Sequence, residues 1–253
     1  MTLGTVTSKS TAMRRLTVAL LGISALVYND WLLQFVVPTG LSQANSYVSE
    51  TFAADQPYRV LFSAEELACA GVIVAAALGG CQLARGRLAR AGWAAMVAFG
   101  MFSVADVLLP MQCAPSVDPH CTESPVHATT SGLVHFALFS SMFLFVLAAR
   151  QGGAGLPVLR RWARWFLPVS MAAAISSVGP FFGYPGGQGI AQRIHLVTVG
   201  VWFMLLATEL ARAHPSAEVS RLSAPARIPR RAHHRRLRGA GRLWPRRRSA
   251  PVA

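Results

Sequence analysis

Charged side chains are scarce in this chain. Only 13% of its 253 residues are Asp, Glu, Lys or Arg, and 53% are hydrophobic. The charged share is about half of the roughly 25% that is usual in soluble domains. A soluble fold with so little charge would be difficult to keep in solution. The composition therefore favours an integral membrane protein.

The sequence motifs of common soluble enzymes are also missing. No glycine-rich nucleotide loop, nucleophile elbow or Cys-x-x-Cys pair occurs in the sequence, which argues against the chemistry that those motifs support. The alternating pattern of a membrane barrel is absent as well. Helices are then the remaining way to satisfy backbone groups within lipid.

Six apolar stretches are each near the length of about 20 residues that a spanning helix needs. They cover residues 16–37, 60–81, 91–112, 131–149, 165–182 and 192–211. The first stretch is longer than the apolar region of a signal peptide and has no clear cleavage site, so we interpret it as a span. We predict an all-α fold, a six-helix transmembrane bundle over residues 16–213, preceded by an N-terminal segment of residues 1–15.

Basic residues fall on alternate sides of the predicted spans. They are frequent in residues 9–15, 85–90 and 150–164 and from Arg212 onward, whereas the opposite loops contain only Arg59 and Arg193. We expect these two side chains to extend to the surface from helix ends. Because cytoplasmic loops are enriched in Lys and Arg, both termini are predicted to be cytoplasmic.

The C-terminal segment, residues 214–253, differs from the rest of the chain. Eleven of the 24 basic residues lie between Arg221 and Arg248, and they contribute most of the formal charge of +14. Pro, Ser, Ala and Arg dominate without an apolar period, which predicts a disordered cytoplasmic tail. Because Trp244 is its only aromatic residue, we expect membrane lipids as its partners and no nucleic acid.

Ionisable residues occur inside the predicted spans, where such groups are rare and often functional. They are Asp30, Glu65, Glu66, Asp106, His135 and His195. At about 1.5 Å of rise per residue, all six lie roughly 5 to 10 Å below the outward surface. We expect them, with Gln192, to line a shared polar layer, in which only one of the adjacent Glu65 and Glu66 points fully inward. A hydrogen-bonded structural core is the alternative.

Two of the four cysteines, Cys113 and Cys121, bracket an outward loop. On an oxidising side of the membrane this spacing favours a disulfide. The alternative is a zinc site, for which the ligands would be Cys113, Cys121, His120 and His127. Its spacing matches no common zinc pattern.

Several short pieces of sequence resemble a bacterial family. They are Tyr28–Trp31, Ser46–Glu50, Ala105–Asp106 followed by the loop Cys113–Cys121, and Gly189–Arg193. Together they resemble the multi-span family catalogued as domain of unknown function 998 (DUF998), over about residues 28–210. The resemblance implies a six-span protein of the bacterial plasma membrane. It brings no established activity, and the tail departs from its pattern.

A fainter similarity is to the membrane hydrolases typified by alkaline ceramidases and the adiponectin-receptor group. It implies a Ser-x-x-x-His motif, an Asp and a later His-x-x-x-His motif around zinc. Ser131, His135 and Asp106 match pieces of that pattern. Two features depart from it, since Val199 stands four residues after His195 and Asp106 precedes the serine.

Two functions are compatible with these residues. The first is a non-enzymatic role in binding or transporting a small molecule or lipid, or in assisting a partner. The second is metal-dependent hydrolysis of a lipid or envelope substrate at the outer leaflet. The hydrolase would hold zinc with Asp106, His135 and His195, and its catalytic candidates are Ser131, Asp106 and His135. Sensing of external pH by the histidines is a third possibility.

Overall fold

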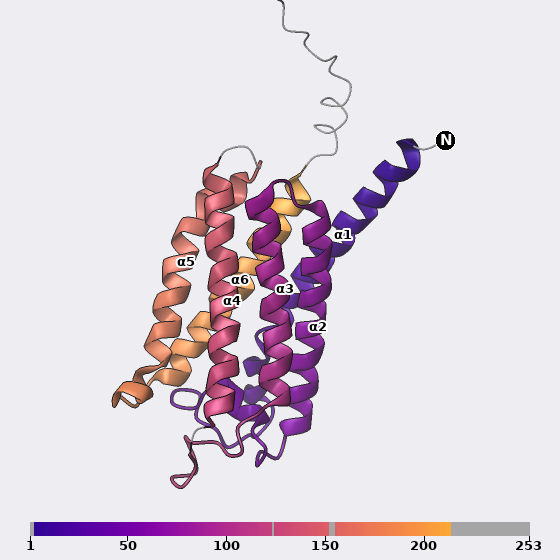
Figure 1. The fold of residues 1–253 in the computed structure, drawn as a ribbon. Helices are drawn as coiled ribbons and strands as arrows, with labels where there is room; N and C mark the ends of the chain where they lie inside the picture. Colours follow the sequence, from indigo (N-terminus) through magenta and orange to yellow (C-terminus); the bar gives the residue numbers. More distant parts are fainter. Residues whose placement is uncertain (1–2, 123, 152–154, 214–253) are drawn as a thin grey trace, which may run out of the picture. The chain divides into compact units, whose positions relative to one another are not determined.

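Six long helices make up most of the described chain (Figure 1). The computed structural model describes residues 3–122, 124–151 and 155–213. The helices are α1 (Leu3–Val27), α2 (Arg59–Leu83), α3 (Arg87–Leu108), α4 (Pro125–Arg150), α5 (Pro157–Ser177) and α6 (Gln188–Arg212). Short 3-10 helices form η1 (Asp30–Phe35), η2 (Val48–Phe52) and η3 (Gly179–Phe182). The described residues contain no strand, which confirms the predicted all-α fold.

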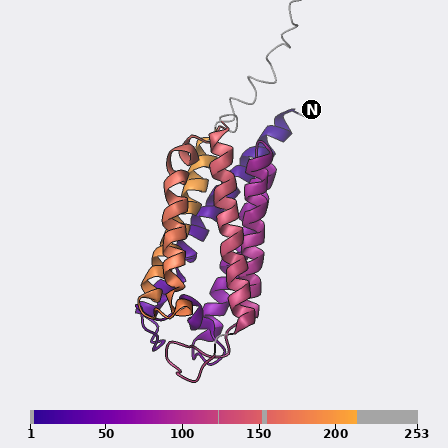
Figure 2. The same cartoon turned by 60° about the vertical axis from the view of Figure 1, so that its left-hand side comes forward.

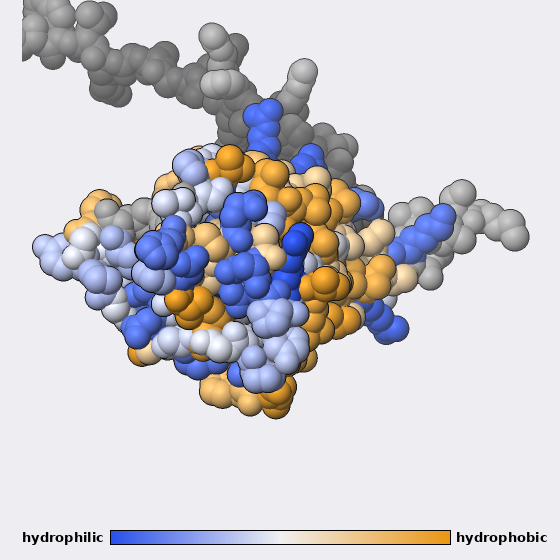
Figure 3. Space-filling model, turned by 90° about the horizontal axis from the view of Figure 1, so that it is seen from below, coloured by the Kyte–Doolittle hydropathy of each residue, from blue (hydrophilic) through white to orange (hydrophobic). Residues whose placement is uncertain are grey.

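Five helical segments are long and apolar enough to cross a membrane. They are Lys9–Phe35, Arg59–Leu83, Arg87–Leu108, Pro125–Arg150 and Gln188–Arg212. The remaining long helix, α5, carries Arg160, Arg161 and Arg164 in its first turns. Seen end-on, hydrophilic residues occupy the middle of one end of the bundle and hydrophobic residues lie along its flank (Figure 3). The chain is a multi-pass membrane protein.

The helices depart from the predicted span limits mainly at their ends. α1 begins at Leu3, within the segment predicted to precede the membrane domain, and its α-helix ends at Val27 before η1 continues the first span. α4 begins at Pro125 instead of residue 131, because the Ser124 side chain caps the backbone N–H of His127 and proline is favourable in a first turn. Apolar runs mark the part of a helix that crosses hydrocarbon, not the turns beyond it.

The fifth helix shows the largest shift. The predicted span covered residues 165–182, whereas α5 covers Pro157–Ser177 and is followed by η3. Its arginine-rich first turns are polar but fully compatible with a helix, since Arg has a good helix propensity. The apolar residues after Ser177 belong to η3, where Gly179 and Pro180 end the regular helix.

The helices form a closed bundle. Each one packs against its neighbours in the chain, and α6 packs against α1. Buried aromatic rings join α3, α4 and α6, with Trp93 and Phe145 centred 5.2 Å apart and Phe145 and Trp202 6.0 Å apart. α4 and α5 form the least extensive interface between consecutive helices. The connecting loops and 3-10 helices before α2, α4 and α6 gather at one end of the bundle (Figure 2).

That end contains the predicted disulfide. Cys113 and Cys121 are bonded to each other, which confirms the pairing. The zinc alternative for this loop is wrong, because both sulfur atoms are used in the disulfide and His127 lies in α4 facing Asp106. The tail, residues 214–253, and its predicted lipid partners lie outside the described residues.

Gly80 allows α2 and α3 to approach closely, since a Cβ at this position would overlap the ring of Trp93. We expect Gly80→Val to lower the stability by about 1–3 kcal/mol, the usual range for overpacking. Thermal unfolding of the purified protein in detergent, followed by tryptophan fluorescence, would measure the change. Gly71→Val is the control on the same helix, because a Cβ there meets nothing within 4 Å. Equal unfolding midpoints for the two variants would contradict the packing argument.

Candidate functional site

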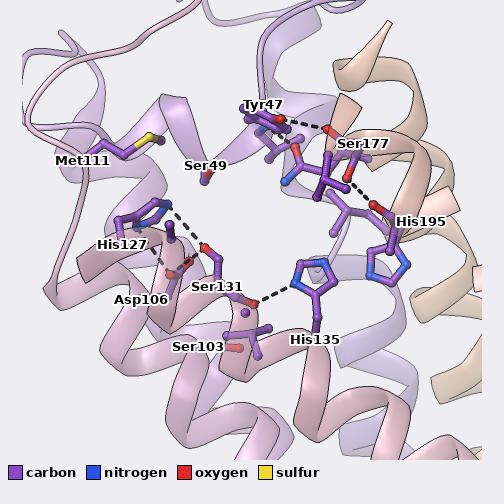
Figure 4. A pocket seen from close by; sticks show the side chains of 18 of the residues that line it. Tyr47, Ser49, Ser103, Asp106, Met111, His127, Ser131, His135, Ser177 and His195 are labelled. Carbon is purple, nitrogen blue, oxygen red and sulfur yellow. Dashed lines mark hydrogen bonds and ion pairs between the residues drawn. The ribbon is translucent and has the colours of Figure 1, made fainter. Parts of the chain in front are cut away.

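A cavity of about 550 Å³ lies in the half of the bundle nearest the disulfide. Side chains from α2, α3, α4, α5, α6 and η2 line it. Of the seven residues predicted to line a ligand site, the structure places five on its wall, which are Glu66, Asp106, His135, Gln192 and His195. Ser131, predicted as a catalytic candidate, lines it as well (Figure 4).

The other two predicted lining residues, Asp30 and Glu65, lie off the cavity wall. They contribute to a separate group of carboxyl oxygens with Glu66, and the oxygens are within 4.8 Å of one another. Glu66 is thus the member of the adjacent pair that faces the cavity. The carboxyl cluster and the cavity therefore meet at Glu66.

Asp106 joins α3 to α4. Its Oδ1 accepts hydrogen bonds from the hydroxyls of Thr130 at 2.5 Å and Ser131 at 2.8 Å, and it lies 3.4 Å from Nδ1 of His127. The opposite ring nitrogen of His127 is 3.5 Å from Oγ of Ser131. Acid, hydroxyl and imidazole thus form a compact group on the left of the close-up view (Figure 4). Because Ser131 donates to the carboxylate, the group is a hydrogen-bonded network between helices.

The second group is a pair of stacked histidines. The rings of His135 and His195 have centroids 5.0 Å apart and planes 23° apart. Nδ1 of His135 lies 2.8 Å from the Ser131 carbonyl oxygen, and Nδ1 of His195 lies 3.2 Å from the carbonyl oxygen and 3.0 Å from the hydroxyl of Ser170. A proton on each Nδ1 would leave each Nε2 as an acceptor, and no hydrogen bond from the described residues reaches these Nε2 atoms.

The predicted zinc ligands Asp106, His135 and His195 all face the cavity but do not form one ion-sized group. Among the described residues, the group whose ligand atoms come within 4.8 Å of one another is Asp30, Glu65 and Glu66. The reason lies in α4, since Thr130 and Ser131 hold the Asp106 carboxylate. The histidines instead lie one turn deeper, where α4 faces α6.

The segment 38–58 covers the end of the cavity nearest the disulfide. The Tyr47 hydroxyl donates to the Ser177 carbonyl oxygen at 2.7 Å, and the backbone N–H of Val48 donates to the side-chain oxygen of Gln192 at 2.6 Å. These bonds attach the cover to α5 and α6. Gln192 therefore has a structural partner in addition to its place on the cavity wall.

Arg193 does not extend to the surface as the sequence predicted. Its side chain is buried and donates to the carbonyl oxygens of Ser46 and Gly189, each at 3.0 Å, and to the side-chain oxygen of Gln34 at 2.7 Å. The guanidinium also lies 5.8 Å from the Trp31 ring centre. The prediction failed because the guanidinium finds acceptors in the cover, in η1 and in its own helix, and the first two cannot be read from spacing in the sequence.

Glu50 is a further buried anchor that sequence reasoning missed. Its carboxylate accepts hydrogen bonds from the backbone N–H of Tyr47 at 2.8 Å and from the backbone and hydroxyl of Ser116 at 3.1 Å and 2.5 Å. Ser116 belongs to the disulfide loop. One carboxylate therefore connects the cover to the loop between α3 and α4.

Besides the phenols of Tyr28 and Tyr47, the ionisable groups on the cavity wall are two carboxyl groups, Glu66 and Asp106, and the imidazoles of His127, His135 and His195. No Lys or Arg of the described residues is part of the lining. The wall is therefore rich in hydrogen-bond acceptors and lacks a fixed positive charge.

His127 could have been found from the sequence as a cavity residue. It stands four residues before Ser131 and eight before His135, so the three share one helix face, and all three line the cavity. Ser170 and Thr198, whose hydroxyls lie 3.0 Å apart beside His195, gave no comparable signal. Serine and threonine are ordinary helix-packing residues in membranes.

Comparison with known proteins gives a family. The family model described as Protein of unknown function (DUF998) matches residues 12–209. No curated protein matched the chain, and no solved structure matched it. The match extends from α1 nearly to the end of α6 and includes every residue of the cavity wall. The chain belongs to the DUF998 family.

Proposed function

We propose that the protein binds an amphiphilic small molecule or lipid in the cavity, with the polar end of the ligand among the side chains of α3, α4 and α6. The supporting observation is that this cavity has a polar inner wall and reaches the apolar flank of the bundle. The polar side consists of Asp106, Ser131, His135 and His195.

The apolar side lies near α5 and η3. Ile175 and Phe182 line the cavity, yet 64% and 73% of their surfaces are exposed, and the exposed Gly132 of α4 lines the same cavity. These residues flank the least extensive interface between consecutive helices. In a bilayer, hydrocarbon chains would reach this opening from the side, so a ligand would enter without crossing water.

The polar wall favours a particular headgroup. Carboxylates and imidazoles with free acceptor nitrogens bind hydroxyl and amine donors, whereas phosphodiester groups usually require Arg or Lys. Because the described lining has no Arg or Lys, we propose a neutral or cationic ligand with donor groups. A transport or accessory role would use the same binding step.

We place the cavity at the outer leaflet of a bacterial plasma membrane. The arginines between α2 and α3 and at the start of α5 lie at the bundle end opposite the disulfide. The positive-inside rule makes that end cytoplasmic, with both termini. Disulfides persist outside the cytoplasm, in agreement with this orientation.

Cysteine labelling tests the orientation. In a background with Cys69→Ser and Cys81→Ser, we expect Asn45→Cys to react with an impermeant maleimide on intact cells and Gly155→Cys to react only after lysis. Both positions are exposed in the structure. Labelling of Gly155→Cys on intact cells would reverse the proposed sides.

Gly132→Phe tests the lateral opening. A side chain at Gly132 would extend into open space at the opening. We expect it to reduce labelling by a photoactivatable diacylglycerol analogue by about tenfold, the effect of losing about 1.4 kcal/mol of binding free energy. The measurement is mass spectrometry of labelled peptides from α4 and α5. Gly71→Phe is the matched control, because Gly71 is also an exposed helical glycine with open space around it.

Competition separates specific binding from general lipid contact. Unlabelled diacylglycerol should displace the probe, and phosphatidylglycerol, which is anionic, should displace it less. Equal labelling of the wild type, Gly132→Phe and Gly71→Phe would remove the proposal.

Metal-dependent hydrolysis is a second candidate, supported by the histidine pair. Metal-binding histidines usually donate their other ring N–H to a carbonyl or carboxylate oxygen, and the Nδ1 atoms of His135 and His195 face carbonyl oxygens in this way. Both residues could hold zinc through Nε2, which would supply Lewis-acid activation of water. Asp106 would not be a direct zinc ligand.

Metal analysis tests this candidate. If it is correct, protein purified without chelators contains about one zinc per chain, and His135→Ala and His195→Ala each lose it. His120→Ala is the control, since His120 is exposed in the disulfide loop. A wild type without stoichiometric zinc after incubation with zinc and desalting would rule the candidate out.

A further inference from the structure

Three carboxyl groups meet beside the cavity, apart from the Asp106 network and the histidine pair. Asp30 begins η1, and Glu65 and Glu66 lie in the second turn of α2. Each residue offers one oxygen, and the three oxygens lie within 4.8 Å of one another. Oxygens about 2.3–2.6 Å from a common centre are separated by at most about 5 Å, so one ion can contact all three.

The Asp30 carboxylate lacks the partners that a buried acid normally has. The residue is only 5% exposed, and among the described residues neither of its oxygens accepts a well-formed hydrogen bond, although the backbone N–H of Trp31 and the charge of Arg193 act on it from nearby. Oε2 of Glu65 is also buried and unpartnered. Nearly all buried polar groups in native proteins are hydrogen-bonded, so a buried carboxylate without a well-formed hydrogen bond beside two others favours a partner outside the described residues, such as an ion.

No Lys or Arg side chain forms a close ion pair with these three carboxyl groups among the described residues. Arg193 is the nearest candidate, but its hydrogen bonds go to Gln34 and to the carbonyl oxygens of Ser46 and Gly189. Its charge interacts with Asp30 over a longer distance, but it forms no close ion pair with Asp30 in the described chain. Three acids held this closely in a bilayer repel one another strongly when ionised, because the surroundings screen charge poorly. A bound cation would remove that repulsion.

We propose that Asp30, Glu65 and Glu66 form a binding site for one hard divalent cation of the class Ca²⁺, Mg²⁺ or Mn²⁺. Carboxylate oxygens without nitrogen or sulfur ligands are the donor set these ions prefer. Glu66 also lines the cavity, so the ion enters from the cavity and water molecules on that side complete its coordination. This site is separate from the histidine pair and does not depend on the amphiphile.

Titration of the purified full-length protein with Mn²⁺ tests the site. After removal of bound metal with a chelator and desalting, electron paramagnetic resonance measures free Mn²⁺. We expect saturable uptake of one Mn²⁺ per chain, displaced by Ca²⁺ or Mg²⁺. Asp30→Asn and Glu66→Gln should each weaken uptake at least tenfold, whereas Asp55→Asn, which changes an exposed carboxyl group of the cover, should leave it unchanged.

Folding is checked separately, by gel filtration and thermal unfolding of every variant. Glu66→Gln decides the test if Asp30→Asn does not fold, because the Glu66 side chain borders open cavity and its amide fits there. The proposal is overturned if the wild type takes up no Mn²⁺ saturably, if uptake survives in folded Glu66→Gln, or if only Na⁺ competes.

Discussion

The fold depends on one constraint, the cost of placing ionisable groups at the depth of hydrocarbon. Facing lipid, each acid would cost about 2.5–3.5 kcal/mol, an appreciable part of the stability of a typical domain. The bundle reduces this cost by turning such groups toward a shared interior. Asp106 is satisfied by hydroxyls of α4, His135 and His195 by carbonyl oxygens of α4 and α5, and Arg193 by the cover.

The polar interior thus consists of three groups of side chains that differ in their hydrogen bonding. The Asp106 network is hydrogen-bonded and connects α3 to α4. The histidine pair faces the cavity with both Nδ1 atoms held by oxygens of α4 and α5, and the cluster of Asp30, Glu65 and Glu66 contains carboxyl oxygens without a well-formed hydrogen bond among the described residues. A ligand headgroup and an ion can therefore occupy neighbouring positions without competing for the same atoms, except at Glu66, which belongs to both the cavity wall and the carboxyl group.

Much of this architecture could be predicted from the sequence, because hydrophobic length and rare buried charge are strong signals in membranes. They identified the helices, the disulfide and the residues Glu66, Asp106, His135 and His195 on the cavity wall. The grouping of those residues could not be predicted. The grouping depends on how each helix is rotated and on how the cover folds. Asp30 therefore lies with Glu65 and Glu66 of α2 and not with the histidines, and the buried Arg193 donates to the cover. Glu50 was missed because its partner Ser116 lies 66 residues away.

That separation bears on how the molecule is made. At about 5–20 residues per second, Ser116 is synthesised roughly 3–13 s after Glu50, since 66 residues separate them. During that interval the young chain exposes a carboxylate whose final hydrogen-bond donor does not yet exist. Until then the backbone N–H of Tyr47, the residue just before the same short helix, is its remaining donor. The contact between the cover and the disulfide loop can consequently form only after the chain has been made beyond α3.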